Sequence, residues 1–211
     1  MLINKNEIYE HFKYLLKDSV KIRMRSDVPY GAFLSGGLDS SSIVALMSEI
    51  SSFPVETFTI GFKEKYFDER HLAMLVANKS HTNHHEYIVE PDTFYKSLNN
   101  IVYHYDEPFG DSSAIPTGHV SKFASSKAKM VLTGDSGDEV LSGYTGYQGE
   151  KFALIYQKLP GWVRKGIPDL TSLISKPFHG SLRYKLNRVL DVCQSSNLNF
   201  IDRYLAKNVY I

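Results

Sequence analysis

The chain of 211 residues is long enough to form one sizeable hydrophobic core, and its composition is that of an ordinary globular protein. Its formal net charge of +1 at pH 7 argues against a protein that binds nucleic acid through bulk charge. The single cysteine, Cys193, excludes a framework of intrachain disulfides and favours a reducing compartment, so we expect a cytoplasmic protein. The sequence shows no leader and no apolar run long enough to span a bilayer, so no membrane partner is expected.

Residues 1–25 are predicted to form one amphipathic helix. Apolar side chains recur at helical spacing along one of its faces: Ile8, Phe12, Leu15, Leu16 and Val20. Asn6 is a candidate for the N-cap, and Pro29 ends the helical pattern.

A strand, a glycine-rich turn and a second helix are predicted next. Residues 32–34 are a short apolar run typical of a buried strand, and apolar residues return at helical spacing from Ile43. Between them, residues 35–40 read SGGLDS, so the backbone can turn tightly and free amides at the following helix can bind an anion. Asp39 would repel a bare phosphate, which indicates a divalent cation between the two. A purely structural turn is the alternative, and a Walker A loop is excluded because no lysine follows the glycines.

The segment SGGLDSS resembles the PP-loop of the N-type ATP pyrophosphatases, which split ATP between its α and β phosphates. The preceding residues 26–34 are similar to the synthetase domain of class B asparagine synthetases. The resemblance implies an α/β fold, with a parallel sheet carrying helices on both faces (adenine nucleotide alpha hydrolase-like), followed by a helical region. ATP and its pyrophosphate are then expected to contact the following residues: Phe33, Leu34, Ser35, Gly36, Gly37, Leu38, Asp39 and Ser40.

The next strand is predicted at residues 55–62, which are rich in β-branched and aromatic residues, and it should run parallel to the first. Open α/β sheets bind ligands at the carboxyl ends of their strands, so Ile60 and Gly61 are expected beside the nucleotide. Core packing is the alternative for Ile60 and, in the first strand, for Phe33 or Leu34. Residues 68–70 are predicted to open another helix, with acidic side chains in its first turn.

Three histidines, His81, His84 and His85, come just before or within a strand predicted at 85–89. Their spacing fits no zinc pattern and no cysteine accompanies them, so a loop leading into a strand is favoured over a metal site.

A helix starting at Pro91 is followed by an acidic segment that contains Asp106, Glu107 and Asp111. The segment resembles one that runs along the rim of the substrate cleft in class B asparagine synthetases. One carboxylate could act as a general base or bind a substrate amine, and Glu107 is the candidate for this catalytic role. The alternative is that Asp111 or Ser112 caps the next helix and that the other two are surface charges.

A second turn that combines glycine and acidic residues follows the strand predicted at 129–134. Residues 135–139 and 142–144 resemble two further segments of the same family. The resemblance implies that Thr133 and Gly134 contact the AMP part of ATP. It further implies that Asp135 takes part in forming an acyl-adenylate. Asp138 would hold Mg2+ together with Asp39, so that the metal-bound pyrophosphate is gripped from two sides.

Strand signals fade beyond residue 150 and basic side chains dominate. We therefore predict a PP-loop ATP pyrophosphatase domain at 1–150 and a basic helical extension at 151–211. Short helices are expected in this extension, divided at Pro160-Gly161, Gly166, Pro168 and Pro177. Its basic face is interpreted as solvated, with an acidic partner or RNA as the alternative.

The function that the resemblance implies is that of an ATP- and Mg2+-dependent amide-forming ligase of the asparagine synthase type. A carboxylate, by resemblance aspartate, is adenylated with loss of pyrophosphate, and ammonia then attacks to give the amide and AMP. The chain begins Met1-Leu2-Ile3, without the N-terminal cysteine of a glutaminase half, so ammonia is expected from solution or from a separate glutaminase domain or subunit. No segment resembles the later lysine-bearing part of the family, so we expect a fragment of a longer enzyme.

Three alternatives stay open. The first is a related ligase that closes β-lactam or peptide rings or amidates polysaccharides. The second is a tRNA-modifying PP-loop enzyme, and the third is an inactive nucleotide-binding subunit. Nucleic acid is nonetheless an unexpected partner, and a homodimer is left open.

Overall fold

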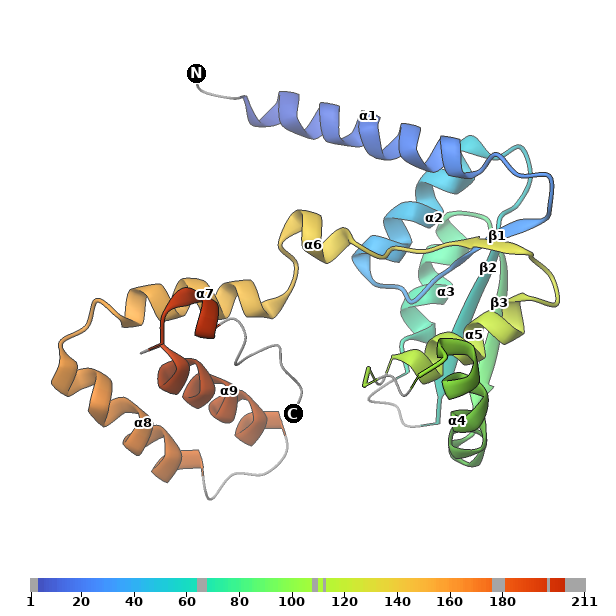
Figure 1. Ribbon diagram of the computed structural model, residues 1–211. Helices are drawn as coiled ribbons and strands as arrows, with labels where there is room; N and C mark the ends of the chain where they lie inside the picture. The colour runs from blue at the N-terminus through green and yellow to red at the C-terminus, as the bar shows by residue number, and fades with distance from the viewer. Residues whose placement is uncertain are drawn as a thin grey trace. The chain divides into compact units, whose positions relative to one another are not determined.

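The computed structural model describes residues 4–63, 68–107, 110–111, 113–175, 181–196 and 198–203. The chain divides into two compact units, residues 1–136 and 137–211 (Figure 1). The first unit contains α1 (Lys5–Arg23), β1 (Tyr30–Phe33), α2 (Leu38–Ile50), β2 (Glu56–Phe62), α3 (Arg70–Lys79), β3 (Asn83–Val89), α4 (Pro91–Tyr105), α5 (Ala114–Ala124) and β4 (Met130–Leu132). The second contains α6 (Gly137–Leu141), α7 (Thr145–Tyr156), α8 (Gly161–Ser175) and α9 (Ser181–Ser195).

The described strands of the first unit form one parallel sheet in the order β3-β2-β1-β4. Ala32 in the middle of β1 pairs with Thr57 of β2 on one side and with Leu132 of β4 on the other. Each of these pairings is parallel because helices return the chain to the same end of the sheet before the next strand starts.

Helices cover both faces of this sheet, and successive strand residues alternate between the two layers. On one face Ala32, Leu34 and Leu132 pack in a core with residues of α1, α2 and α3. On the other face Phe58 packs with residues of α5, among them Val120. The predicted α/β class, with a parallel sheet and helices on both faces, is confirmed.

The strand order creates a switch point between β1 and β4. The chain passes from β1 to β2 and then to β3 in one direction, and afterwards returns to the other side of β1 to form β4. The loops that leave β1 and β4 therefore diverge from the same edge of the sheet. In open α/β sheets, ligands bind outside the carboxyl ends of the strands at such a point.

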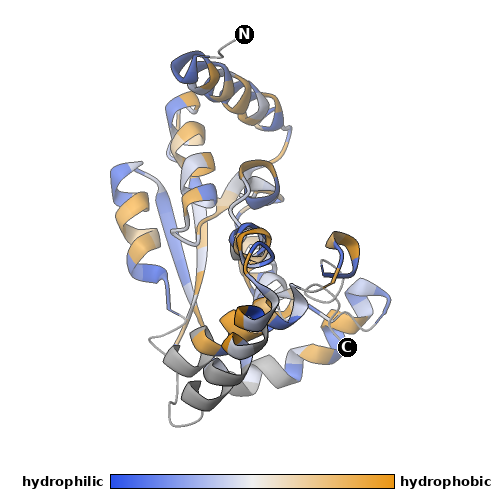
Figure 2. Ribbon diagram, turned by 90° about the vertical axis from the view of Figure 1, so that its left-hand side faces the viewer, coloured by the Kyte–Doolittle hydropathy of each residue, from blue (hydrophilic) through white to orange (hydrophobic). Residues whose placement is uncertain are grey.

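The first helix is shorter than predicted. Apolar residues recur at regular intervals along it (Figure 2), and Val20 near its carboxyl end is buried. The prediction that Asn6 caps the helix was wrong, because Asn4 has the extended backbone of an N-cap and its Oδ1 accepts a hydrogen bond of 3.1 Å from the Asn6 N–H. A capping side chain needs a free amide two or three positions further on, which Asn6 supplies here.

The break predicted at Pro160-Gly161 is confirmed, since α7 ends at Tyr156 and α8 begins at Gly161. Pro177 lies outside the described residues. The helix α8 runs through both Gly166 and Pro168, so the prediction that these two residues interrupt the helices was wrong. Proline has no N–H to bond the carbonyl four residues earlier, which here belongs to Arg164. The Tyr156 hydroxyl of α7 donates a hydrogen bond of 2.6 Å to that carbonyl. The helix therefore tolerates Pro168 because a neighbouring helix supplies a replacement donor.

The boundary predicted from composition, at residue 150, lies inside α7, whereas the two units meet at residues 136 and 137. The division into a PP-loop domain and a basic extension stays a prediction. Within the described ranges, none of the helices combines the length and the apolar character that a membrane crossing requires.

Candidate functional site

Two serines shape the loop between β1 and α2. Ser40 Oγ accepts a hydrogen bond of 3.2 Å from the Ser35 N–H and lies 3.0 Å from Ser35 Oγ. Ser35 Oγ in turn accepts a hydrogen bond of 3.1 Å from the Gly37 N–H. Hydrogen bonds to the hydroxyl groups of these two serines therefore hold the backbone amides of the loop in a defined arrangement.

The amino end of α2 lacks a capping side chain. Its N-cap is Gly37, and the Ser41 N–H makes the first helical bond, of 3.0 Å, to the Gly37 carbonyl. The amides of Leu38, Asp39 and Ser40 thus precede the first hydrogen-bonded turn, where the helix dipole favours negative charge. The Ser41 hydroxyl is buried and has no hydrogen-bond partner among the described residues. This end of α2 is suited to receive an anion.

Gly36 fits the loop against α3. Its φ angle of +83° lies in the left-handed region, which residues with a side chain adopt only at a cost. A Cβ atom at this position would lie 2.5 Å from Leu72 Cβ and 2.6 Å from the Ala73 nitrogen. Both backbone conformation and space therefore require glycine here.

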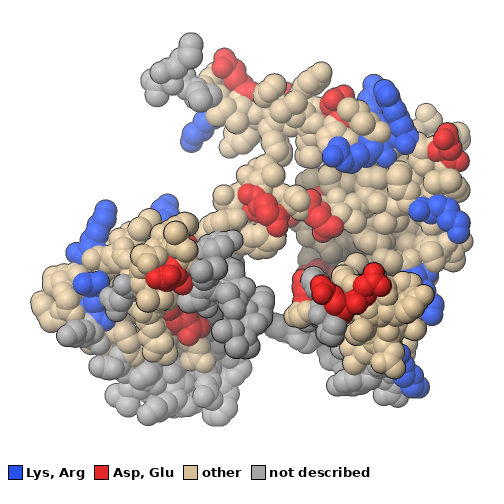
Figure 3. Space-filling model, viewed as in Figure 1, with Lys and Arg blue, Asp and Glu red and all other residues tan. Residues whose placement is uncertain are grey.

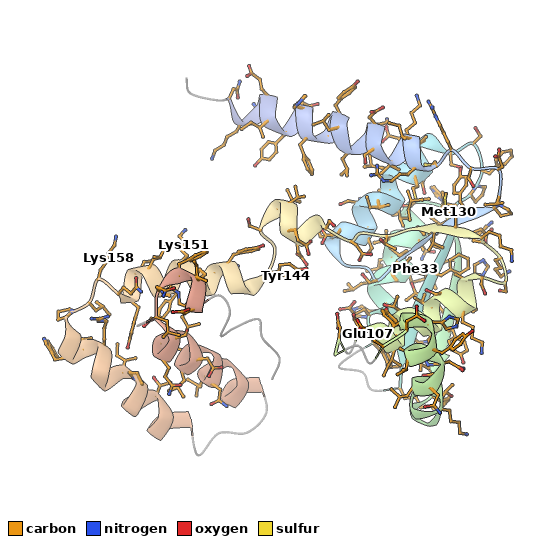
Figure 4. All side chains as sticks on the ribbon, in the orientation of Figure 1. Phe33, Glu107, Met130, Tyr144, Lys151 and Lys158 are labelled. Carbon is orange, nitrogen blue, oxygen red and sulfur yellow. The ribbon has the colours of Figure 1, made fainter. Side chains whose placement is uncertain are left out.

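The end of β1 is tied to β2 at Leu34. The Leu34 N–H donates a hydrogen bond of 2.9 Å to the Phe58 carbonyl, and the buried hydroxyl of Thr59 donates to the Leu34 carbonyl. The Leu34 side chain is 1% exposed within the core, and both of its backbone polar groups are bonded to β2, so this residue anchors the end of β1. Phe33 packs on the opposite face of the sheet (Figure 4).

An arginine that sequence reasoning missed covers the end of β2. A Cβ atom on Gly61 would lie between 2.2 and 2.9 Å from atoms of the Arg70 side chain. Arg70 donates two hydrogen bonds to Asp68, of 2.8 and 2.7 Å, and its Nη1 lies 3.6 Å from Glu86 Oε2. The hydrogen bond from Arg70 holds the pKa of Asp68 below its usual range.

This arrangement corrects the prediction for residues 68–70. Since α3 begins at Arg70, Asp68 and Glu69 precede its first turn and do not complement its dipole from within the helix. A charged pair that packs beside a glycine of the preceding strand leaves no periodic signal in the sequence. Only the aspartate and arginine two residues apart could have suggested the fork-shaped contact.

The loop that follows β4 meets the first turn of α2 at Gly134. A Cβ atom on Gly134 would lie 2.6 Å from the Ser40 nitrogen and 2.8 Å from the Asp39 carbonyl carbon. Across Gly134, the hydroxyl of Thr133 donates a hydrogen bond of 2.7 Å to Asp135 Oδ2. The structure thus brings the second glycine-bearing turn into backbone contact with the first turn of α2, at the switch point of the sheet.

Asp138 is the second residue of α6 and so belongs to the other unit. The space-filling view shows acidic side chains over α6 (Figure 3). No group of three or more metal-ligating side chains lies together among the described residues. Carboxylates such as Asp39 and Asp138 nevertheless fit Mg2+, because proteins commonly bind this ion through one or two carboxylates, phosphate oxygens and water.

The acidic segment after α4 has one residue with a structural role. Asp111 Oδ1 accepts a hydrogen bond of 2.8 Å from the Ser113 N–H, at the amino end of α5. Glu107 is exposed just beyond the left-handed residue Asp106, at which α4 ends (Figure 4). A catalytic role for Glu107 stays a prediction. Other residues of the same predicted segment lie outside the described residues: Pro108, Phe109 and Ser112.

The three histidines take part in local contacts. His81 has a φ angle of 53° in the turn before β3. His84 Nδ1 lies 3.0 Å from the buried Thr57 Oγ1, and His85 Nε2 lies 2.6 Å from Glu56 Oε2. These distances indicate hydrogen bonds between β2 and β3.

The burial of His84 predicts that stability falls in mild acid. Burial lowers the pKa of His84, although the nearby Glu86 acts in the opposite direction. Below its ordinary pKa of about 6.5, the unfolded chain binds a proton that the folded chain excludes. We therefore expect the free energy of unfolding to fall by up to about 1.4 kcal/mol per pH unit as the pH drops through 6.5. Urea denaturation between pH 5.5 and 8 measures this slope.

His84→Gln removes the titrating ring and should flatten the slope. Burial also lowers the pKa of His119, so a smaller slope of the same sign is expected to persist in the variant. An identical slope in the two proteins would contradict the assignment to His84.

The comparisons with known proteins point to one family. The family model for asparagine synthase matches residues 11–206. The putative glutamine-hydrolyzing asparagine synthetase 2 of Methanocaldococcus jannaschii is 46% identical over 165 residues, which cover 77% of this chain and 32% of that protein. The glutamine-hydrolyzing asparagine synthetase 1 of Bacillus subtilis is 30% identical over 175 residues, which cover 83% and 28%.

The chain therefore spans about a third or less of the length of these curated relatives. Among solved structures, the NH3-dependent NAD synthetase of Campylobacter jejuni aligns over 99% of both chains, with 11% identity and a TM-score of 0.39. That likeness is too remote to bear on the function. The family model covers nearly the whole chain and includes both glycine-bearing turns, so this chain belongs to the asparagine synthase family.

Proposed function

We propose that this chain forms the ATP-binding part of an amide-forming ligase that adenylates a carboxylate, with aspartate as the expected substrate. The observation that carries the proposal is the contact of Gly134 with Asp39 and Ser40, since it joins the loop after β4 to the first turn of α2 at the switch point of the sheet. Membership in the asparagine synthase family supports the same reaction class.

In this proposal the triphosphate of ATP lies along the loop of residues 35–40. The free amides of Leu38, Asp39 and Ser40 receive the leaving pyrophosphate, and the buried Ser41 hydroxyl is a further donor within the same turn. The adenosine part extends along the ends of β1, β2 and β4, near Phe33, Ile60, Gly61, Thr133 and Gly134. Leu34 fixes the end of β1 beside the adenosine, since its side chain is buried and its N–H and carbonyl are both bonded to β2.

The substrate carboxylate attacks the α-phosphorus of ATP and displaces pyrophosphate, which gives an acyl-adenylate. Ammonia then attacks the activated carbonyl, so that the amide forms and AMP leaves. Asp135, whose carboxylate accepts a hydrogen bond from Thr133, and the exposed Glu107 are the proposed catalytic carboxylates. A general base is needed because ammonia must lose a proton as the amide forms.

Mg2+ bound by Asp39 and Asp138 would neutralise charge on the leaving pyrophosphate. Fixed amide donors at the start of α2 act on the same charge, and such preorganised donors commonly supply the largest share of a rate enhancement. The nitrogen source is proposed to be ammonia or a glutaminase domain or subunit, since the relatives are named glutamine-hydrolyzing. The cytoplasm is the proposed location.

The decisive experiment incubates this chain with ATP, Mg2+, ammonium and aspartate that carries 18O in its carboxylates. Adenylation requires release of pyrophosphate that depends on aspartate, and it transfers one 18O atom to AMP. If another carboxylic acid stimulates the release of pyrophosphate and aspartate does not, the assignment of aspartate as the substrate is rejected. The assignment as an amide-forming ligase is then retained. ATP binding without turnover across a panel of amino acids would favour the nucleotide-binding subunit.

A further inference from the structure

The segment that follows α6 folds back onto the acidic residues of that helix. The Gly143 N–H donates a hydrogen bond of 2.9 Å to the Asp138 carbonyl. The Tyr144 hydroxyl donates a hydrogen bond of 2.6 Å to Glu139 Oε1, which raises the pKa of Tyr144 to about 12. Residues 142–144, to which the sequence alone assigned no role, are therefore anchored to α6 by two contacts.

The conformation of the backbone does not explain the glycine in this segment. The left-handed residue of the turn is Ser142, with a φ angle of 58°, whereas Gly143 is not among the residues with positive φ. Residues with a side chain can adopt the backbone conformation of Gly143 without the left-handed penalty. A different constraint must favour glycine.

That constraint is the carboxylate of Asp138. A Cβ atom on Gly143 would lie 2.0 Å from Asp138 Oδ1 and 3.1 Å from Asp138 Cγ. Since real Cβ contacts below 3.0 Å are essentially never seen, a methyl group at this position would displace the oxygen by about 1 Å. The aspartate side chain thus occupies the space that the missing side chain of Gly143 leaves open.

We infer that Gly143 is a positioning residue: the space that it leaves open keeps the Asp138 carboxylate in one orientation. This inference rests on the proposed function of Asp138 as a metal ligand. Asp138 lies on a short helix, and the contact with Gly143 restricts its side chain from one side. Misplacing a catalytic group by 1 Å can cost about 10²-fold in rate.

The test compares Gly143→Ala with Gly146→Ala in the full chain. Gly146, the second residue of α7, is the matched control because a Cβ atom there would meet nothing within 4 Å. Calorimetry measures the affinity for pyrophosphate in the presence of Mg2+, and thermal unfolding checks that both variants fold. We expect Gly143→Ala to bind Mg2+-pyrophosphate at least about tenfold more weakly, while Gly146→Ala binds as the unchanged protein does.

A second pair of proteins separates positioning from a general structural role. In a protein with Asp138→Asn, adding Gly143→Ala should cause little further loss of affinity, because the charge that it would misplace is already absent. Equal losses from Gly143→Ala in the two backgrounds would overturn the inference, as would unchanged affinity in the single variant. If the unchanged chain does not bind Mg2+-pyrophosphate at all, the proposed function fails first and the inference fails with it.

Discussion

Replacing Asp39 with asparagine should lower the rate of ATP-dependent pyrophosphate release by about 10²-fold or more, with little change in stability. The Asp39 side chain takes part in no hydrogen bond or ion pair found among the described residues, so the structure does not need its charge. Its position in the first turn of α2 suits the helix dipole, which is worth about 0.3–1 kcal/mol at an exposed site. The remaining reason for a carboxylate at this position is its proposed role as a ligand of the Mg2+ that accompanies pyrophosphate.

The measurement is the dependence of pyrophosphate release on Mg2+ concentration. Asparagine keeps the size of the side chain but is a poorer ligand, so the half-saturating Mg2+ concentration should rise as the maximal rate falls. Glu49→Gln is the matched control, since it neutralises another carboxylate on α2 that pairs with Lys17 at the surface. We expect the control to keep the activity. Unchanged Mg2+ dependence in Asp39→Asn would mean that this carboxylate does not serve the metal.

The sequence allowed the strands and their parallel arrangement to be predicted because buried strands carry a local signal. The apolar run at 32–34 and the β-branched run at 55–62 each mark a strand, and an intervening helical pattern requires a parallel pairing. Turns that carry glycine and acidic residues directly after strands also point to the carboxyl edge of the sheet. The architecture, and the edge of the sheet at which the candidate site is proposed, were therefore predictable from local patterns.

Contacts between distant residues could not be predicted in the same way, because they depend on the exact register of the strands and helices. Gly134 meets Ser40 only because β4 pairs with β1. The Thr59 hydroxyl reaches the Leu34 carbonyl for a similar reason, across the pair formed by β1 and β2. A glycine in the sequence predicts a turn, but it does not show which neighbouring residue occupies the space of the missing side chain.

Gly36→Ala is expected to disrupt the loop itself. A left-handed conformation costs a residue with a side chain about 1–2 kcal/mol, and overpacking against a fixed neighbour typically costs about 1–3 kcal/mol more. The neighbours of Gly36 are Leu72 Cβ and the backbone nitrogen of Ala73, which cannot move away as a flexible side chain could. We expect the first unit to lose about 2–5 kcal/mol of stability and ATP binding to weaken below detection.

Gly37→Ala provides a demanding control because it alters the adjacent residue of the same loop. The φ angle of Gly37 is −65°, and a Cβ atom there would lie 3.2 Å from the hydroxyl of Ser35, which can rotate. Its loss of stability should therefore be well below that of Gly36→Ala. Urea denaturation followed by circular dichroism measures both variants, and amide hydrogen exchange in α2 locates the damage. Of the two glycines, Gly36 is the one that contacts α3. Equal losses of stability in the two alanine variants would therefore contradict a role for this contact in holding the loop.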